Sequence, residues 1–370
     1  MQLFSRLLYT FLPVFLPPFL RAWRFLVVAL LLLSCSQGPA PHTGTRILLS
    51  DAQFAQTCLL PRGSGYTRRS PFAELRVQTN ATSLDLSFVA TIARAFPTAA
   101  GIAVWDDTTF VGLVSDTSTA EQTKRVDLPG NGMRVLRFVE GAQAVHNDTT
   151  DAPRLGTFVT KVVFPAGSIA TVLAPIPSAN CLYVVGDSNS NGFGAGSNQR
   201  YGWLPLLRAQ LGYDVVLDGW GYRSWTRSLG SSAQQDALVA RIVGTMKHRK
   251  RKQVLFALGT NDEYLAFGSS SRVDTISTQV LKKLRTAEPT VRIFLQTPPS
   301  LGRHEHRRNS FGETMPRMRA ALVKAAKTAR GVTVVDGLTV VPAGQFAEDD
   351  VHFTPAGHVS AARAVYSILQ

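Results

Sequence analysis

The sequence predicts a β-sandwich followed by an α/β domain of three layers, α/β/α, built around a five-stranded parallel sheet. Three observations support this prediction. Residues 47–173 hold short runs with the two-residue alternation of strands. After Cys181, apolar strand-like runs alternate with segments of helical periodicity. A stretch with two prolines, residues 174–180, separates the two patterns and is expected to be a stiff linker.

The composition is that of a folded chain. Of the 370 residues, 45% are hydrophobic and 17% are charged, which excludes the composition of a disordered protein. The formal net charge is +14; residues 1–34 supply three of these charges and leave +11 on the remainder. This charge favours anionic partners such as acidic polysaccharide, lipid head groups or nucleic acid. A soluble surface that is simply basic fits the count equally well.

Residues 1–35 have the organisation of an export signal. Arg6, Arg21 and Arg24 precede nine unbroken apolar residues, 25–33, which are too few for a membrane-spanning helix of roughly 20 residues. Leu-Leu-Ser-Cys at the end of this leader resembles a bacterial lipobox, with Cys35 as the lipidated residue. The alternative is an ordinary signal peptide that contains a cysteine. We expect an exported protein with no nucleic-acid partner, either anchored to the cell envelope by lipid (in the outer membrane of a Gram-negative host) or secreted.

The segment after the leader and the two remaining cysteines bear on how the domains are joined. Residues 36–46 are rich in Pro, Gly, Ser and Thr and are expected to form a tether. Only Cys58 and Cys181 remain after Cys35. In an exported protein they can pair, which would join the start of the first domain to the start of the second. Two buried free thiols are equally compatible with the sequence.

Residues 47–173 are expected to form the β-sandwich, of a jelly-roll-like kind. Leu84, Leu86 and Phe88 alternate with polar residues. The same alternation runs through residues 158–164, with an interruption at positions 160 and 161. Turn-forming residues separate such runs, and several short strands at this spacing predict a sandwich.

Residues 181–370 are expected to form the α/β domain. Five apolar strand-like runs alternate with helices, which predicts a parallel sheet covered on both faces. In such sheets the chemistry lies at the carboxyl ends of the strands. The last helix is expected to bury Val359, Ala362, Tyr366 and Leu369 and to leave His358 pointing outward. The five strand-like runs are residues 182–185, 215–217, 254–258, 291–295 and 332–335.

Four polar segments lie at or beyond these carboxyl ends. Gly-Asp-Ser-Asn at 186–189 follows the first strand directly, and its glycine lets the chain turn so that the Ser188 hydroxyl is exposed. Gly-Trp-Gly-Tyr at 219–222 follows the second strand, and Gly-Thr-Asn-Asp at 259–262 follows the third. Asp-Asp-Val-His at 349–352 precedes the last helix. Each segment alone is weak evidence for a functional site, but the four segments in this order are strong evidence for one.

In this order the four segments resemble the blocks of the SGNH, or GDSL-like, hydrolases, over residues 181–370. The resemblance implies the flavodoxin-like α/β/α fold of that family and a serine esterase. It identifies Ser188 as nucleophile, His352 as general base and Asp349 as the residue that orients His352. It places the N–H groups of Ser188 and Gly221 and the side-chain amide of Asn261 around the oxyanion.

Some positions leave alternatives. The residue after Ser188 is Asn, where the family usually has Leu or Ile. Gly221, rather than Gly219, is assigned to the oxyanion hole from its position. Asp350 is an alternative to Asp349 as the partner of His352, although the Asp-x-x-His spacing favours Asp349.

Several weaker signals surround these blocks. Trp220, Tyr222 and Trp225 flank the second block, and Trp220 and Tyr222 are candidates for binding a sugar ring, with core packing as the alternative. Thr-Pro-Pro at 297–299 is expected to shape the mouth of the pocket. His-Glu-His at 304–306 lacks further ligands at suitable spacing and is interpreted as a basic surface loop, so we expect no metal and no cofactor.

A β-rich domain before such a hydrolase resembles the two-domain carbohydrate acetylesterases, and residues 75–82 look similar to an early strand of their sandwich. The resemblance implies removal of acetyl groups from a polysaccharide or another carbohydrate through an acyl-enzyme. One alternative is a lipase, lysophospholipase or thioesterase that acts on longer acyl chains. Another, of a different class, is a non-catalytic glycan-binding lipoprotein of the cell envelope.

Overall fold

The computed structural model describes residues 44, 46–48, 54–55, 74–90, 101–107, 109–116, 118, 120–143, 155–173, 179–195, 200, 202–212 and 214–370. The expected export signal with Cys35, almost all of the expected tether, Cys58 and most of the expected linker lie outside these residues. Residues Thr43 to Gln370 form one compact unit. The domain boundaries expected at residues 173 and 181 stay a prediction.

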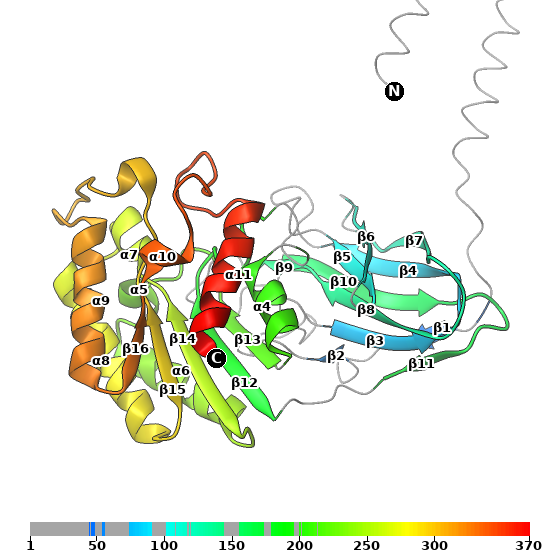
Figure 1. Cartoon of the computed structure of the whole chain (residues 1–370), viewed down its shortest axis with the longest axis horizontal. Helices are drawn as coiled ribbons and strands as arrows, with labels where there is room; N and C mark the ends of the chain where they lie inside the picture. The colour runs from blue at the N-terminus through cyan, green and yellow to red at the C-terminus, as the bar shows by residue number, and fades with distance from the viewer. Residues whose placement is uncertain are drawn as a thin grey trace, which may run out of the picture. The chain divides into compact units, whose positions relative to one another are not determined.

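Two antiparallel sheets form the β-rich part (Figure 1). In the first sheet the order is β1-β10-β4-β7, with β9 paired to β10. In the second the order is β11-β3-β8-β5-β6, with β2 paired to β3. The strands of the first sheet are β1 (Arg46–Leu48), β4 (Ser83–Ala90), β7 (Gln122–Asp127), β9 (Ala142–Gln143) and β10 (Leu155–Val163). Those of the second are β2 (Phe54–Ala55), β3 (Glu74–Thr79), β5 (Ile102–Asp106), β6 (Thr109–Val114), β8 (Arg134–Glu140) and β11 (Ala170–Val172).

The sandwich core follows the alternation in the sequence. The three alternating side chains of residues 84–88 are fully buried and share a hydrophobic cluster with Leu136 and Phe138 of the other sheet. The interruption at positions 160 and 161 is a β-bulge, because the register between β10 and β4 shifts between Val159 and Lys161. This extra residue lets Val159 and Val162 both point into the core.

The second part contains the predicted five-stranded sheet, in the order β13-β12-β14-β15-β16, with all strand pairs parallel. Its strands agree with the five apolar runs to within a few residues. The fold class expected from the sequence is therefore confirmed. The strands are β12 (Asn180–Gly186), β13 (Asp214–Gly219), β14 (Arg251–Ala257), β15 (Arg292–Gln296) and β16 (Val332–Val335).

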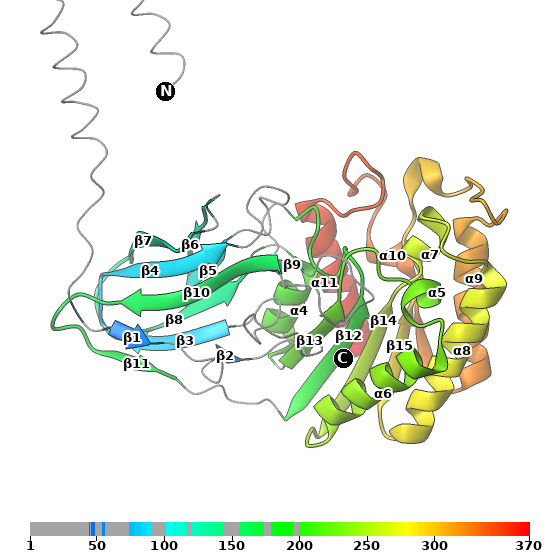
Figure 2. The same ribbon diagram turned by 180° about the vertical axis from the view of Figure 1, so that it is seen from behind.

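Helices cover both faces of the parallel sheet (Figures 1 and 2). Tyr183 and Val185 of β12 pack in a cluster with α6, α8 and α9, whereas Leu182 and Val184 pack in a cluster with α4 and α11. Residues that alternate along a strand point to opposite faces, so an almost continuous apolar run feeds two cores. The helices are α4 (Trp203–Leu211), α5 (Trp225–Ser228), α6 (Ser232–Met246), α7 (Thr260–Tyr264), α8 (Ser270–Ala287), α9 (Met315–Ala329), α10 (Gly337–Val340) and α11 (Pro355–Leu369), with a 3₁₀ turn η2 (Gly302–His304).

The orientation expected for the last helix is wrong by about one residue. The Thr354 side chain caps α11, and Pro355 occupies its first turn, as expected. Ala362 and Leu369 are buried, as expected. The buried face also contains His358, Ala361 and Val365, however, whereas Val359 and Tyr366 are only partly buried. His358 therefore lies inside the fold, fully buried, instead of pointing outward.

Cys181 is a free thiol in β12, fully buried, and burial raises its pKa to about 12. Cys58, with which Cys181 could form a disulfide according to the sequence, lies outside the described residues. Within the part of the chain that the structure describes, no helix is long and apolar enough to span a bilayer.

Candidate active site

Three of the predicted site segments leave the sheet at one level. Gly186, the last residue of β12, is paired with Gly219 of β13 on one side and with Ala257 of β14 on the other. All three strands are parallel, so the loops that follow them emerge at the same carboxyl edge. The register therefore brings the Ser188 loop, the loop after β13 and the start of α7 together.

The turn that carries Ser188 is tightly built. A Cβ at Gly186 would overlap the Ser190 side chain, which explains the glycine. The Asp187 carboxylate accepts the Asn189 backbone N–H at 3.0 Å, and the Ser188 carbonyl accepts the Phe193 N–H at 3.0 Å. Burial raises the pKa of Asp187 to about 7, although backbone N–H groups act in the opposite direction. Ser188 itself remains half-buried.

His352 joins the two other residues that the sequence places with it. Its Nε2 lies 3.0 Å from Ser188 Oγ, and its Nδ1 lies 2.5 Å from Asp349 Oδ2. The other Asp349 oxygen accepts the backbone N–H groups of Val351 and His352, each at 3.0 Å. Partial burial raises the pKa of Asp349, but these hydrogen bonds outweigh it and hold the pKa below its usual value. With Nδ1–H donating to Asp349, Nε2 is free to accept the serine proton.

Asp350, the alternative partner of His352, is engaged elsewhere. Its Oδ2 lies 2.8 Å from Arg303 Nε, and its backbone has a φ of 56°. Gly302, beside Arg303, lies close enough that a Cβ there would come within 3.3 Å of the Asp350 carboxyl group. Asp350 therefore anchors the loop after β15. Of the two aspartates, only Asp349 contacts the His352 side chain.

Gly219, the last residue of β13, and Gly221, in the loop that follows, have different surroundings. A Cβ at Gly219 would come within 2.8 Å of the Gly186 carbonyl oxygen, so this glycine is needed for close approach of two strands. A Cβ at Gly221 would meet no described atom within 4 Å. A side chain at position 221 would therefore enter open space.

Asn261 lies in the first turn of α7 and is almost fully buried. Its Nδ2 donates one of its two hydrogens to the Arg223 carbonyl oxygen at 3.0 Å. This bond does not engage the second hydrogen. The next residue, Asp262, accepts the Trp225 and Thr226 N–H groups, both at 2.9 Å, and so ties α7 to the start of α5. Burial raises the pKa of Asp262 to about 6.

The aromatic candidates separate into three environments. Trp225 is fully buried and stacks on Phe256, so it belongs to the core. Trp220 is partly buried, and its ring faces the Arg223 guanidinium at 4.0 Å. Tyr222 is 50% exposed and has a φ of 62°, an uncommon conformation for a residue other than glycine. Of the three, only Tyr222 offers a large ring surface to a ligand.

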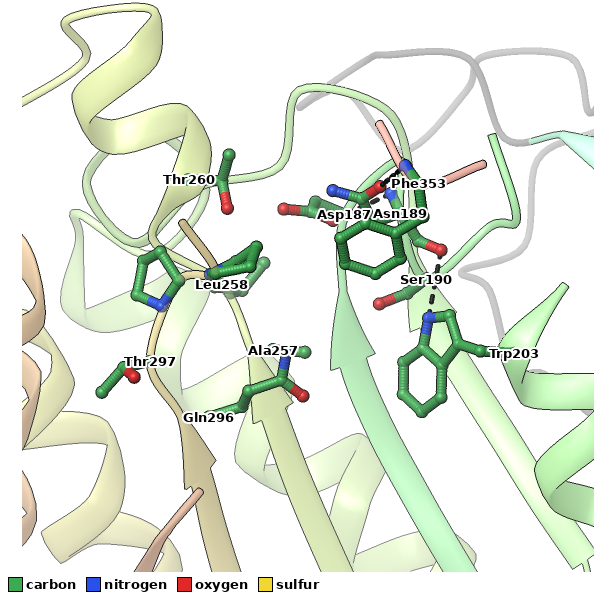
Figure 3. Close-up of a pocket in the computed structure, with 12 residues that line it drawn as sticks. Asp187, Asn189, Ser190, Trp203, Ala257, Leu258, Thr260, Gln296, Thr297 and Phe353 are labelled. Carbon is green, nitrogen blue, oxygen red and sulfur yellow. Dashed lines mark hydrogen bonds between the residues drawn. The ribbon is translucent and has the colours of Figure 1, made fainter. Parts of the chain in front are cut away.

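A small pocket lies at the carboxyl ends of β12, β14 and β15 (Figure 3). Its lining includes the two neighbours of Ser188, Asp187 and Asn189, together with Leu258, Trp203 and the predicted segment 297–299. Its volume is about 20 Å³, which is room for about one water-sized group. Ser188 itself does not line it.

Two residues of the His-Glu-His segment at 304–306 contact other side chains. Glu305 forms an ion pair with Arg319, and the His304 ring packs edge-on against Tyr264. Among the residues that the structure describes, no group of three or more His, Cys, Asp or Glu side chains is arranged to hold a metal ion.

Two residues near His352 were not found from the sequence. The Asn189 side chain donates to the Val351 carbonyl at 3.1 Å and accepts the Phe353 N–H at 3.2 Å, so it grips the backbone on both sides of His352. The Phe193 ring packs on the His352 imidazole with 4.2 Å between centroids. The only sign of these contacts in the sequence was the Asn after Ser188, where the family usually has Leu or Ile.

Residues 184–359 match the GDSL-like lipase/acylhydrolase family. The α/β domain is a GDSL-like hydrolase domain. The chain is accordingly a carboxylic ester hydrolase. No curated protein gives a significant match to its sequence.

Solved structures share the fold of this ester hydrolase. A family two carbohydrate esterase from Clostridium thermocellum, in complex with cellohexaose, has 14% identity and a TM-score of 0.58, over 88% of this chain and 98% of its own. An acetyl xylan esterase from Butyrivibrio proteoclasticus has 13% identity and a TM-score of 0.58, over the same two shares. The salicylyl-acyltransferase SsfX3 of a tetracycline biosynthetic pathway has 17% identity and a TM-score of 0.60, over 79% and 80%.

Proposed function

We propose that this GDSL-like hydrolase removes acetyl groups from a carbohydrate through an acyl-enzyme on Ser188. The observation that carries the proposal is the unbroken chain of hydrogen bonds from Asp349 through His352 to Ser188. A serine hydroxyl becomes an effective nucleophile when a neighbouring imidazole accepts its proton. A non-catalytic glycan-binding role would not require this arrangement.

In the first half-reaction Ser188 Oγ attacks the acetyl carbonyl carbon as His352 Nε2 takes the hydroxyl proton. The negative charge on the former carbonyl oxygen is met by the N–H groups of Ser188 and Gly221 and by the Asn261 amide. His352 then gives its proton to the sugar oxygen, which leaves as a hydroxyl group. Asp349 holds the imidazole in the correct tautomer and stabilises its charged form throughout.

In the second half-reaction a water molecule attacks the acetyl-enzyme while His352 accepts one of its protons. The second tetrahedral intermediate uses the same oxyanion donors. Collapse of this intermediate returns the proton from His352 to Ser188 Oγ and releases acetate. The cycle needs no metal and no cofactor.

Two observations support a small acyl group on a sugar. The pocket of about 20 Å³ between the neighbours of Ser188 and the residues after β14 and β15 is of a size for a small group such as a methyl group. The exposed ring of Tyr222 stands on the loop that also carries Gly221, where it can stack on a sugar face. The structural relatives include an acetyl xylan esterase and an esterase with bound cellohexaose.

Initial rates on aryl acetate, butyrate and octanoate esters test the acyl length, and acetate release from acetylated xylan and acetylated cello-oligosaccharides tests the sugar. We expect kcat/KM to fall steadily from acetate to octanoate, together with acetate release from at least one glycan. Faster turnover of the octanoate would favour a lipase or thioesterase and contradict the acetyl assignment.

Lipidation of Cys35 is proposed from the order of the leader: basic residues, an apolar run, then Leu-Leu-Ser-Cys and a polar tether. One acyl chain gives only marginal membrane binding, and a diacylglyceryl group, which lipoproteins of this kind carry, meets the need for two. Labelling with a palmitate analogue in a bacterial host, with Cys35→Ser as the control, tests the anchor. A wild-type protein that stays unlabelled and is freely secreted would contradict it.

A further inference from the structure

The loop after β13 is closed by a buried ion pair. Arg223 is fully buried, and its Nη1 donates both to the backbone carbonyl of Asp218 and to Asp218 Oδ1, the latter at 2.9 Å. Asp218 lies one residue before the end of β13 and Arg223 lies two residues before α5, so the ion pair spans the loop that carries Gly221. One guanidinium therefore fixes the distance across this loop.

The carboxylate that holds Arg223 is itself anchored to two other elements. Asp218 Oδ2 accepts the Tyr183 hydroxyl of β12 at 2.7 Å and the Arg241 guanidinium of α6 at 3.0 and 2.9 Å. Burial raises the pKa of Asp218, but the two guanidinium groups outweigh it and keep the pKa below its usual value. Because β12 leads directly to Ser188, the ion pair ties the Gly221 loop to the strand that delivers the nucleophile.

The rest of the guanidinium is covered by the same loop. Its carbon lies 4.0 Å from the centroid of the Trp220 ring, a distance at which the ring face attracts a cation. Its Nε and Nη2 are buried without a hydrogen-bond partner in the described part of the chain. The Arg223 guanidinium therefore contacts one carboxylate, that of Asp218, and one aromatic ring, that of Trp220. Both contacts constrain the loop.

The backbone of Arg223 reaches the other oxyanion donor. Its carbonyl accepts one hydrogen of the Asn261 amide at 3.0 Å. This bond sets the plane of the amide and therefore the direction of its second N–H. Gly221 is two residues before Arg223 in the same loop, so both donors outside the Ser188 loop depend on where Arg223 lies.

We infer that Arg223 is a positioning residue that fixes the Gly221 N–H and the Asn261 amide for the oxyanion. The inference rests on the oxyanion assignment made under the proposed function. A buried ion pair contributes little net stability, because desolvation of both charges offsets their attraction. Oxyanion donors, in contrast, must be held within about 0.5 Å of their working positions. A costly buried pair around a catalytic loop is therefore explained better by positioning than by stability.

The test compares Arg223→Lys and Arg223→Met with Arg249→Met, which removes a cation paired with Asp214 at the other end of β13 and leaves Asp218 and its partners intact. On an aryl acetate we expect both Arg223 variants to lose kcat by roughly 10- to 100-fold with KM little changed, the usual result of misplacing a catalytic group. Arg249→Met is expected to lower Tm and to keep kcat close to that of wild type. Arg223→Met leaves Asp218 short of a partner, so the double variant Asp218→Asn/Arg223→Met, which removes both charges, is measured beside it and should show the same loss of kcat.

Equal kcat losses in Arg249→Met and the Arg223 variants, or a loss confined to KM, would overturn the role of Arg223. Asn261→Ala separates this failure from failure of the proposed function, because loss of one oxyanion donor should lower kcat by roughly 10²–10³. If Asn261→Ala lowers kcat as expected and the Arg223 variants do not, only the positioning role falls. If Asn261→Ala retains its kcat, the oxyanion assignment falls and the inference falls with it.

Discussion

Asn189 holds the backbone on both sides of His352 from its place next to Ser188. Its Nδ2 lies 3.1 Å from the Val351 carbonyl oxygen and its Oδ1 lies 3.2 Å from the Phe353 nitrogen. The Asn189 side chain thus bonds to two backbone groups, as a neighbouring strand would. It joins two loops that are far apart in the sequence. It sets the separation between Ser188 and His352, on which proton transfer depends.

Replacing Asn189 by Leu, the residue usual in the family, should lower kcat by about 10- to 100-fold, because the His352 loop is released. Each backbone group left buried without its partner should also cost about 1–3 kcal/mol of stability. Steady-state kinetics and thermal unfolding measure both effects. Asn80→Ala, which removes an amide bonded to the Ile169 N–H in the sandwich, is the control and should leave kcat unchanged. Wild-type kcat in Asn189→Leu would show that the His352 loop needs no such support.

Gly221 and Gly219 should respond differently to alanine. At Gly221 the added methyl group enters unfilled space, so the variant should fold with a Tm near that of wild type and lose kcat by obstructing the oxyanion. At Gly219 the methyl group would collide with the Gly186 carbonyl, so Tm should fall. Gly244→Ala in α6, where no described atom lies within 4 Å, is the folding control. A fully active Gly221→Ala would show that the oxyanion does not occupy this open space.

Asp349 and Asp350 provide a second pair of contrasting variants. Asp349→Asn should lower kcat by roughly 10⁴-fold, the loss typical of a misoriented catalytic histidine. Asp350→Asn should have a far smaller effect, because that carboxylate pairs with Arg303 and does not touch His352. Kinetics of the two purified variants decide the matter. A larger loss in Asp350→Asn would transfer the orienting role to Asp350.

His358 should make stability depend on pH. Burial lowers its pKa from 6.5 to about 4, although a hydrogen bond to the Phe193 carbonyl acts in the opposite direction. The unfolded chain therefore binds a proton at His358 more readily than the folded chain between about pH 6.5 and 4. The stability of the neutral, buried ring is fully present above pH 6.5 and is lost progressively as the pH falls toward 4.

Thermal unfolding of the wild type and of His358→Gln between pH 4 and 7.5 tests this pH dependence. Asp187 and Asp262 have raised pKa values, so they act with the opposite sign and lower stability as the pH rises. The difference between the two proteins isolates His358, since both carboxyl groups are common to them. The wild type should lose more Tm than His358→Gln as the pH falls below 6.5. Parallel curves would show that His358 is not buried in its neutral form.

The sequence predicted what depends on local pattern. The five apolar runs predicted the parallel strands, and the polar segments after them predicted which residues meet at the carboxyl edge. The roles of Asn189 and Arg223 could not be predicted, because their partners are set by packing between separate loops. His358 was placed on the wrong side of its helix because a shift of one residue, about 100° of rotation, exchanges buried and exposed positions.

The most direct test of the account is whether Ser188 carries the acyl group. A fluorophosphonate probe, followed by peptide mass spectrometry, should label Ser188 in the wild type and label nothing in Ser188→Ala. The variant should keep the Tm of the wild type, because the hydroxyl group is half-buried and a methyl group fits in its place. We expect hydrolysis of an aryl acetate by Ser188→Ala to be reduced to a trace. Substantial turnover by the folded variant, or probe attached to another residue, would contradict the central claim.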